Sequence, residues 1–169
     1  MRSCPNWMIF SNAGVLLDPV TGGPIVDQDF QTNLPGIFAA GNVVHVYDQV
    51  DWVTEAGLIA GHGAARFAQG KLKKPERLVD TQAGENVRYV VPQHFDPAAL
   101  ESDPLSLQMR VRQPVEEPVR VTASVNGEII ARSAMRYARP GEMITLRLKD
   151  SALPVLEKAD KITLDIVKR

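Results

Sequence analysis

The second half of the chain alternates between apolar and polar residues in a way that predicts short β-strands. Apolar residues recur at every second position over 105–111 and again over 119–125. A period of two places these side chains on one face of a strand. Similar segments lie at 143–148 and 162–167. We therefore expect roughly five to seven short strands here, arranged as a small sandwich or barrel.

A hairpin is predicted between two of these strands. Asn126-Gly127 stands between two alternating runs, and both central residues of a type I′ turn need a positive φ, which Asn and Gly adopt most readily. This dipeptide therefore predicts a two-residue turn that sets the pairing of the strands on either side.

The first part of the chain has a different pattern. Residues 37–40 are all apolar and precede Gly41, which predicts a short strand covered on both faces. Residues 50–67 predict a helix. Its small residues repeat at helical spacing, which would let a flat group or another backbone approach closely; these are Val53, Ala56, Gly57, Ala60, Gly61, Ala64 and Ala65.

The change of pattern predicts two domains. A charged, Pro-containing stretch at 71–77 is typical of a boundary that few contacts cross. We expect a first domain at 1–70, a linker at 71–85, and a β-sandwich-like domain at 86–169 that folds independently.

Composition narrows the possible partners. The chain is 44% hydrophobic and 23% charged, with a net charge of −1, as in ordinary globular proteins. It lacks the basic excess that binding to nucleic acid or an anionic membrane requires. No apolar run is long enough for a transmembrane helix, and the first residues do not resemble a secretory signal. Together with the single cysteine, Cys4, this predicts a cytoplasmic protein.

The stretch 32–43 has the most informative order of residues, TNLPGIFAAGNV. An apolar segment leads to Gly41, where the absent side chain lets the backbone approach a ligand. Asn42 can then direct a polar group toward a sugar or ribitol hydroxyl, because its carbonyl accepts and its amide donates hydrogen bonds. The N–H groups that follow, from Val43 onward, can contact an anionic linker such as pyrophosphate.

This stretch resembles the second FAD-binding motif of the two-dinucleotide-binding-domain flavoproteins, the superfamily of thioredoxin reductase and glutathione reductase. Their pattern is Thr, a short gap, Pro-Gly-hydrophobic-aromatic-Ala-x-Gly-Asp, and then a helix. Asn42 stands where the superfamily has Asp, so the formal charge is absent. The alternative is an ordinary buried strand and turn of an unrelated α/β domain.

Residues 4–24 and 41–53 are similar to a narrower group, the flavin-dependent oxidoreductases encoded beside glycerol-3-phosphate dehydrogenase-like proteins. The resemblance implies that the start of the helix lies against the pyrimidine end of the isoalloxazine. A helix N-terminus stabilises the negative charge of reduced flavin. The cofactor-binding residues that it implies are Gly41, Asn42, Val43, Val50, Asp51, Trp52 and Val53.

The superfamily's first motif, a strand followed by Gly-x-Gly-x-x-Gly, is not found in these residues. The fold class that we expect is therefore an α/β flavoprotein fragment, the C-terminal lobe of an FAD-binding domain, followed by the β domain. The chain would complete an FAD site only with a missing N-terminal FAD- and NAD-binding region as its partner. NAD(P)H would be the co-substrate, and a dehydrogenase-like flavoprotein subunit is a further expected partner.

The function expected from this resemblance is that of the C-terminal part of an FAD-dependent NAD(P)H oxidoreductase, catalytically incomplete alone and with no identifiable acid, base or nucleophile. The alternative is a non-catalytic docking module with a degenerate flavin-domain scaffold. Among single residues, His45 fits a structural hydrogen bond or a proton relay. Asp48 or Asp51 fits a helix cap, and Trp52 fits either flavin stacking or core filling. The three histidines lack metal-ligand spacing.

Overall fold

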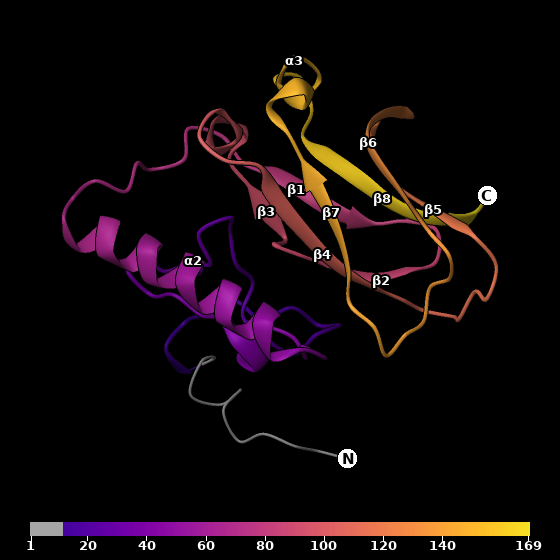
Figure 1. Ribbon diagram of the computed structural model, residues 1–169. Coiled ribbons are helices and arrows are strands. Elements are labelled where there is room, and N and C mark those ends of the chain that lie inside the picture. The colour runs from indigo at the N-terminus through magenta and orange to yellow at the C-terminus, as the bar shows by residue number, and fades with distance from the viewer. Residues whose placement is uncertain (1–11) are drawn as a thin grey trace. The chain divides into compact units, whose positions relative to one another are not determined.

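The computed structural model describes residues 12–169, and the chain divides into two compact units between Lys74 and Pro75 (Figure 1). Cys4 and the start of the 4–24 resemblance lie outside the described residues. The protein is a mixed α/β fold with two sheets, composed mostly of strands with few helices. Over the described residues, no helix is long and apolar enough to cross a membrane.

The second unit contains two sheets. The five-stranded sheet has the order β3-β1-β8-β5-β6 and the three-stranded sheet has the order β2-β4-β7. Short helical turns join some of the strands: η2 (Pro97–Glu101), η3 (Asp150–Ala152) and α3 (Leu153–Leu156). The strands are β1 (Val79–Ala83), β2 (Val87–Val91), β3 (His94–Phe95), β4 (Leu105–Val111), β5 (Val119–Val125), β6 (Glu128–Met135), β7 (Ile144–Leu148) and β8 (Lys161–Lys168).

Both sheets contribute to one apolar core in this unit. On β8, every second residue is buried; Ile162 and Leu164 belong to the core, together with Leu107 of β4 and Ile144 of β7. Burying a side chain of this size contributes about 1.5–3 kcal/mol. The strands predicted at 105–111 and 119–125 are therefore confirmed. Seven strands, β2 to β8, lie within residues 86–169, in agreement with the expected five to seven, and β1 precedes them.

The predicted hairpin is confirmed as well. β5 and β6 pair antiparallel, with Val125 opposite Glu128. The two residues between them have positive φ, 49° at Asn126 and 89° at Gly127. Both signs agree with a type I′ turn, whose twist matches that of the flanking strands.

The expected boundary at residue 86 is wrong, because β1 lies within the segment expected to be a linker. β1 occupies the position between β8 and β3, and Val79 at its start is fully buried in the core. Arg77 attaches the residues before β1, since its guanidinium donates to the backbone carbonyls of Leu156 and Glu157. The unit therefore begins at Pro75. The charged residues at 71–77 are typical of a linker, so the sequence pattern did not indicate β1. The partner strand β8 lies far along the chain.

The described part of the first unit contains one long helix, α2 (Val50–Ala68), which confirms the helix predicted at 50–67 (Figure 1). A short 3-10 helix, η1 (Gly41–Val43), precedes it. The strand predicted at 37–40 is not formed; only Phe38 makes an isolated bridge, to Gln31. A strand needs continuous backbone partners, and a run of apolar side chains does not supply them.

The small residues of α2 are divided between two faces. Ala56, Ala60 and Gly63 are buried, whereas Gly57 and Gly61 are exposed. A Cβ on either exposed glycine would meet no atom within 4 Å. The close-packed face of the helix is therefore narrower than the sequence predicted. Its buried residues are centred on Ala60.

Candidate functional site

Residues 41–47, which include η1 and lead toward α2, form a closed turn. Gly41 has φ +72°, a left-handed conformation that favours glycine. Its carbonyl accepts the N–H of Val44 at 2.9 Å. The side chain of Asn42 then closes the turn, because its Oδ1 accepts the backbone N–H of Tyr47 at 3.0 Å. The carbonyl expected to face a ribitol hydroxyl is thus engaged by the protein's own backbone.

This turn is packed on one side and open on the other. Val44, His45 and Tyr47 are buried, and the rings of His45 and Tyr47 lie with their centroids 4.3 Å apart. Asn42 is exposed, and Val46 is 66% exposed. His45 therefore lies in the packed side of the turn. The buried aromatic contact fixes the turn, while Asn42 remains accessible from solvent.

A second loop packs directly against this turn at Gly23. A Cβ built at Gly23 would lie 2.1 Å from the carbonyl oxygen of Val44 and 2.4 Å from that of Val43. The loop itself is held by Asp18, whose Oδ1 accepts the N–H groups of Val20 at 2.7 Å and Thr21 at 2.9 Å. Asp18 therefore closes a turn at the start of this loop. Only glycine fits at position 23, because the contact is between two backbones.

The N-terminus of α2 follows the turn. Gln49 is the N-cap residue and makes no side-chain capping bond. Neither Asp48 nor Asp51, one of which was expected to cap the helix, occupies the N-cap position. Asp51 lies in the first turn of the helix, where its charge complements the helix dipole. Val50 is 75% exposed.

The other residues expected near a flavin have mixed exposure. Trp52, Val53 and Val43 are half-buried, and Gly41 is buried. A Cβ on Gly41 would lie 3.5 Å from Cγ1 of Val53, so the structure brings these two positions together. Of the set implied by the resemblance, Asn42, Val50 and Asp51 are exposed.

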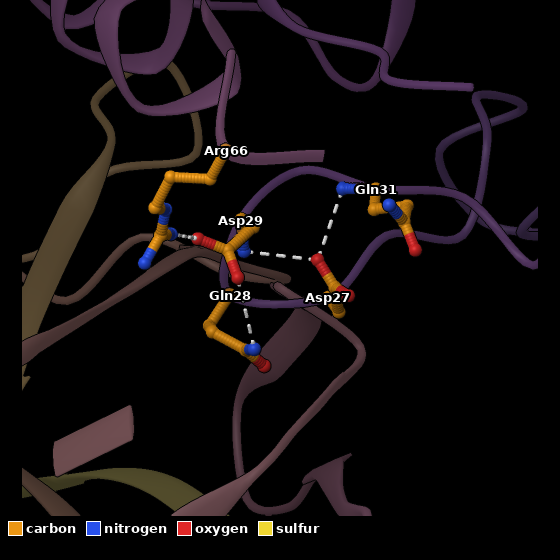
Figure 2. A network of polar contacts seen from close by, with 5 residues as sticks. All are labelled: Asp27, Gln28, Asp29, Gln31 and Arg66. Atoms are coloured by element: carbon orange, nitrogen blue, oxygen red, sulfur yellow. Dashed lines mark hydrogen bonds and ion pairs between the residues drawn. The ribbon is translucent and has the colours of Figure 1, made fainter. Parts of the chain in front are cut away.

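A polar network that the sequence analysis missed surrounds the loop at residues 27–31 (Figure 2). Oδ1 of Asp27 accepts the backbone N–H groups of Asp29 and Gln31, each at 2.9 Å. Asp29 forms an ion pair with Arg66 of α2 and accepts a hydrogen bond from Gln28 at 3.2 Å. The loop is thereby closed by Asp27 and attached to the helix by Asp29.

Burial dominates the electrostatics of Asp27. The residue is only 8% exposed, and this desolvation raises its pKa to about 6. The two N–H groups that it accepts and the charge of Arg66 lower the pKa, whereas the charge of Asp29 raises it further. Nearby, the side-chain nitrogen of Gln31 is buried without a hydrogen-bond partner. The only sequence signal for this network is the Asp-x-Asp spacing, which is also common in solvated loops.

Neither the network nor the turn forms a metal site; within residues 12–169, no group of three or more His, Cys, Asp or Glu side chains could hold a metal ion. The chemistry of the turn and helix start is that of hydrogen-bond donors beside two acids.

In comparisons with known proteins, no family model, no curated protein and no solved structure matches this chain.

Proposed function

We propose that this chain supplies the ribitol and isoalloxazine side of an FAD site in an NAD(P)H-dependent oxidoreductase. The observation that carries the proposal is the sequence Gly41-Asn42, placed in a left-handed turn that leads into the N-terminus of α2. A helix start of this kind, without a side-chain cap, has N–H groups that can face an electron-rich ligand.

The residues present fit this role in part. Gly41 leaves room that a Cβ would occupy beside Val53, and Asn42 and Val50 are both exposed. Bound flavin would supply the hydride and electron chemistry. The chain's own residues would orient the flavin and, through the helix dipole, favour negative charge on it. No side chain here is assigned as a catalytic acid or base.

The test is FAD binding by the complete gene product, including any sequence that precedes Met1. We expect flavin absorbance after purification, and we expect Gly41→Ala to weaken FAD binding at least tenfold. Gly14→Ala is the matched control, because Gly14 also has a positive φ (+81°) but a Cβ there meets nothing within 4 Å. A colourless product that does not quench FAD fluorescence on titration would rule out the proposal.

One observation favours the alternative function, a docking module. Within residues 12–169, β6 is an edge strand that pairs only with β5, and Ile129 on it is 52% exposed. An edge strand offers unpaired backbone groups to a partner, and a dehydrogenase-like flavoprotein subunit is the partner that the sequence resemblance implies. Under this alternative, Ile129→Lys would abolish association with that subunit and leave FAD binding unchanged.

A further inference from the structure

We propose that residues 27–31 form a pH-dependent conformational switch, which releases residues 37–39 more often at neutral pH than in mild acid while α2 stays folded. The switch lies within the first unit and works without the proposed flavin. Its central group is the buried carboxylate of Asp27 (Figure 2). Residues 37–39 lead to Gly41, so the switch acts on the segment that carries the turn there.

Backbone hydrogen bonds join the loop to the segment that it releases. The N–H of Ala39 donates to the carbonyl of Phe30 at 2.9 Å, and Gln31 forms an isolated β-bridge with Phe38. Inside the loop, the N–H of Gln31 donates to Oδ1 of Asp27 at 2.9 Å. A change at Asp27 therefore reaches that segment through two consecutive residues of the loop.

The carboxylate of Asp27 makes the closed loop sensitive to pH. The residue is only 8% exposed, and an ionised carboxylate is costly to bury. Both N–H groups that it accepts bind Oδ1, so a proton on Oδ2 leaves these hydrogen bonds in place. Burial raises the pKa of Asp27 from 3.8 to about 6. The stabilisation that this proton gives the closed loop is therefore complete below about pH 4 and is lost as pH rises through 6.

The other charges that act on Asp27 come from its own loop and from α2. Beside the effects of burial and of the two N–H groups, Asp29 raises the pKa of Asp27 and Arg66 lowers it. These two residues form an ion pair with each other. Residues 37–39, which pair with the loop, are apolar. Burial therefore remains the dominant influence on the carboxylate.

Two features of the closed loop oppose closure. Phe30 is buried with φ +58°, a left-handed conformation that bulky residues rarely adopt. The side-chain nitrogen of Gln31 is buried, and within residues 12–169 it has no hydrogen-bond partner. The loop is attached to α2 by the ion pair of Arg66, whose side chain is 52% exposed, and a pair so exposed contributes little. Opening therefore relieves both costs without breaking a hydrogen bond inside the helix.

The test is amide hydrogen exchange of the full chain at pH 5 and pH 7.5, measured by NMR and divided by the intrinsic rate of each amide. The amides of Gln31 and Ala39 report the switch, and that of Ala60 in the interior of α2 reports unfolding of the helix. Asp27→Asn removes the titration and keeps an oxygen for the two N–H groups. Asp18→Asn is the matched control, because it makes the same change at the carboxylate that closes another loop of this unit.

We expect protection of Gln31 and Ala39 to fall about tenfold from pH 5 to pH 7.5 in the wild type and in Asp18→Asn, and to stay within about twofold in Asp27→Asn. Both amides should be about tenfold or more less protected than Ala60, because the loop opens more often than the helix unfolds. Histidine commonly titrates in this pH range. His62→Gln on α2 should therefore retain the fall, which assigns it to the carboxylate.

Unchanged protection of Gln31 and Ala39 between the two pH values in the wild type would overturn the proposal. So would a fall that persists in Asp27→Asn, or one that disappears in His62→Gln. Protection of Ala39 equal to that of Ala60 would overturn it as well, since the loop would then open only when the whole unit unfolds.

Discussion

The two units of the molecule are stabilised in different ways. In the second unit, long-range strand ladders surround one apolar core to which both sheets contribute. In the described part of the first unit, there is one long helix, and short loops are closed by side-chain oxygens that accept backbone N–H groups, as at Asp18, Asp27 and Asn42. Stability in the second unit therefore depends on side-chain volume, whereas in the first it depends on backbone contacts and polar groups.

The largest effect expected from this difference is on the limits of the second unit. A chain of residues 75–169 should melt cooperatively, whereas residues 86–169 alone should not, because removing β1 leaves β8 and β3 without their shared neighbour and takes Val79 from the core. Circular dichroism with thermal melting of both chains measures this. A cooperative melt of 86–169 would show that the unit folds without β1.

The next effect concerns a backbone contact in the first unit. Gly23→Ala should destabilise that unit by about 3 kcal/mol, the upper end for overpacking, because the methyl group would meet two carbonyl oxygens that cannot rotate away. Gly57→Ala is the control; it adds the same methyl group on an exposed helix position and should stabilise by about 1 kcal/mol. Chemical denaturation measures both. A Gly23→Ala protein as stable as the wild type would mean that the two loops separate freely.

The smallest effect is a gain in stability at Asp27. Because its pKa is raised to about 6 from 3.8, the folded form binds a proton more tightly than the unfolded form. The favourable contribution is complete below about pH 4 and is lost as pH rises through 6. Two pKa units correspond to about 3 kcal/mol, and burying an amide offsets part of this.

Asp27→Asn should therefore stabilise the first unit by about 1–2 kcal/mol at pH 7.5, with the difference disappearing near pH 4. Asp29→Asn is the comparison, since it loses the ion pair with Arg66 and should destabilise at pH 7.5. Thermal melts across this pH range test the sign. A destabilised Asp27→Asn protein at pH 7.5 would mean that the charge itself holds the loop.

The sequence predicted the second unit well where the information is local. Alternation places Leu107 and Met109 on one face, and Asn126-Gly127 specifies its turn from two residues. β1 could not be found this way, because its pairing with β8 depends on residues near the other end of the unit. Its charged and polar residues, such as Asp80, are also typical of a linker.

In the first unit, the sequence located the turn at Gly41 and the helix but not the contacts around them. Side-chain polarity does not reveal whether the oxygen of Asn42 faces a ligand or Tyr47, since a ligand hydroxyl and a backbone N–H are equally suitable hydrogen-bond donors. The contact between two backbones at Gly23 could not be predicted either. The sequence does not distinguish a loop glycine with open space around it, such as Gly22, from one packed against other atoms. These contacts arise from tertiary structure.

The parallel pairing of β1 with β8 has a consequence for biosynthesis. β8 lies between β1 and β5, and its Asp165 accepts the N–H of Glu85, 80 residues earlier, at 2.6 Å. During translation, β1 and β5 leave the ribosome long before this central strand exists. The five-stranded sheet therefore cannot close until residues 161–168 have emerged, so a chain arrested before that point exposes one unpaired edge of β1 and one of β5 to chaperones and proteases.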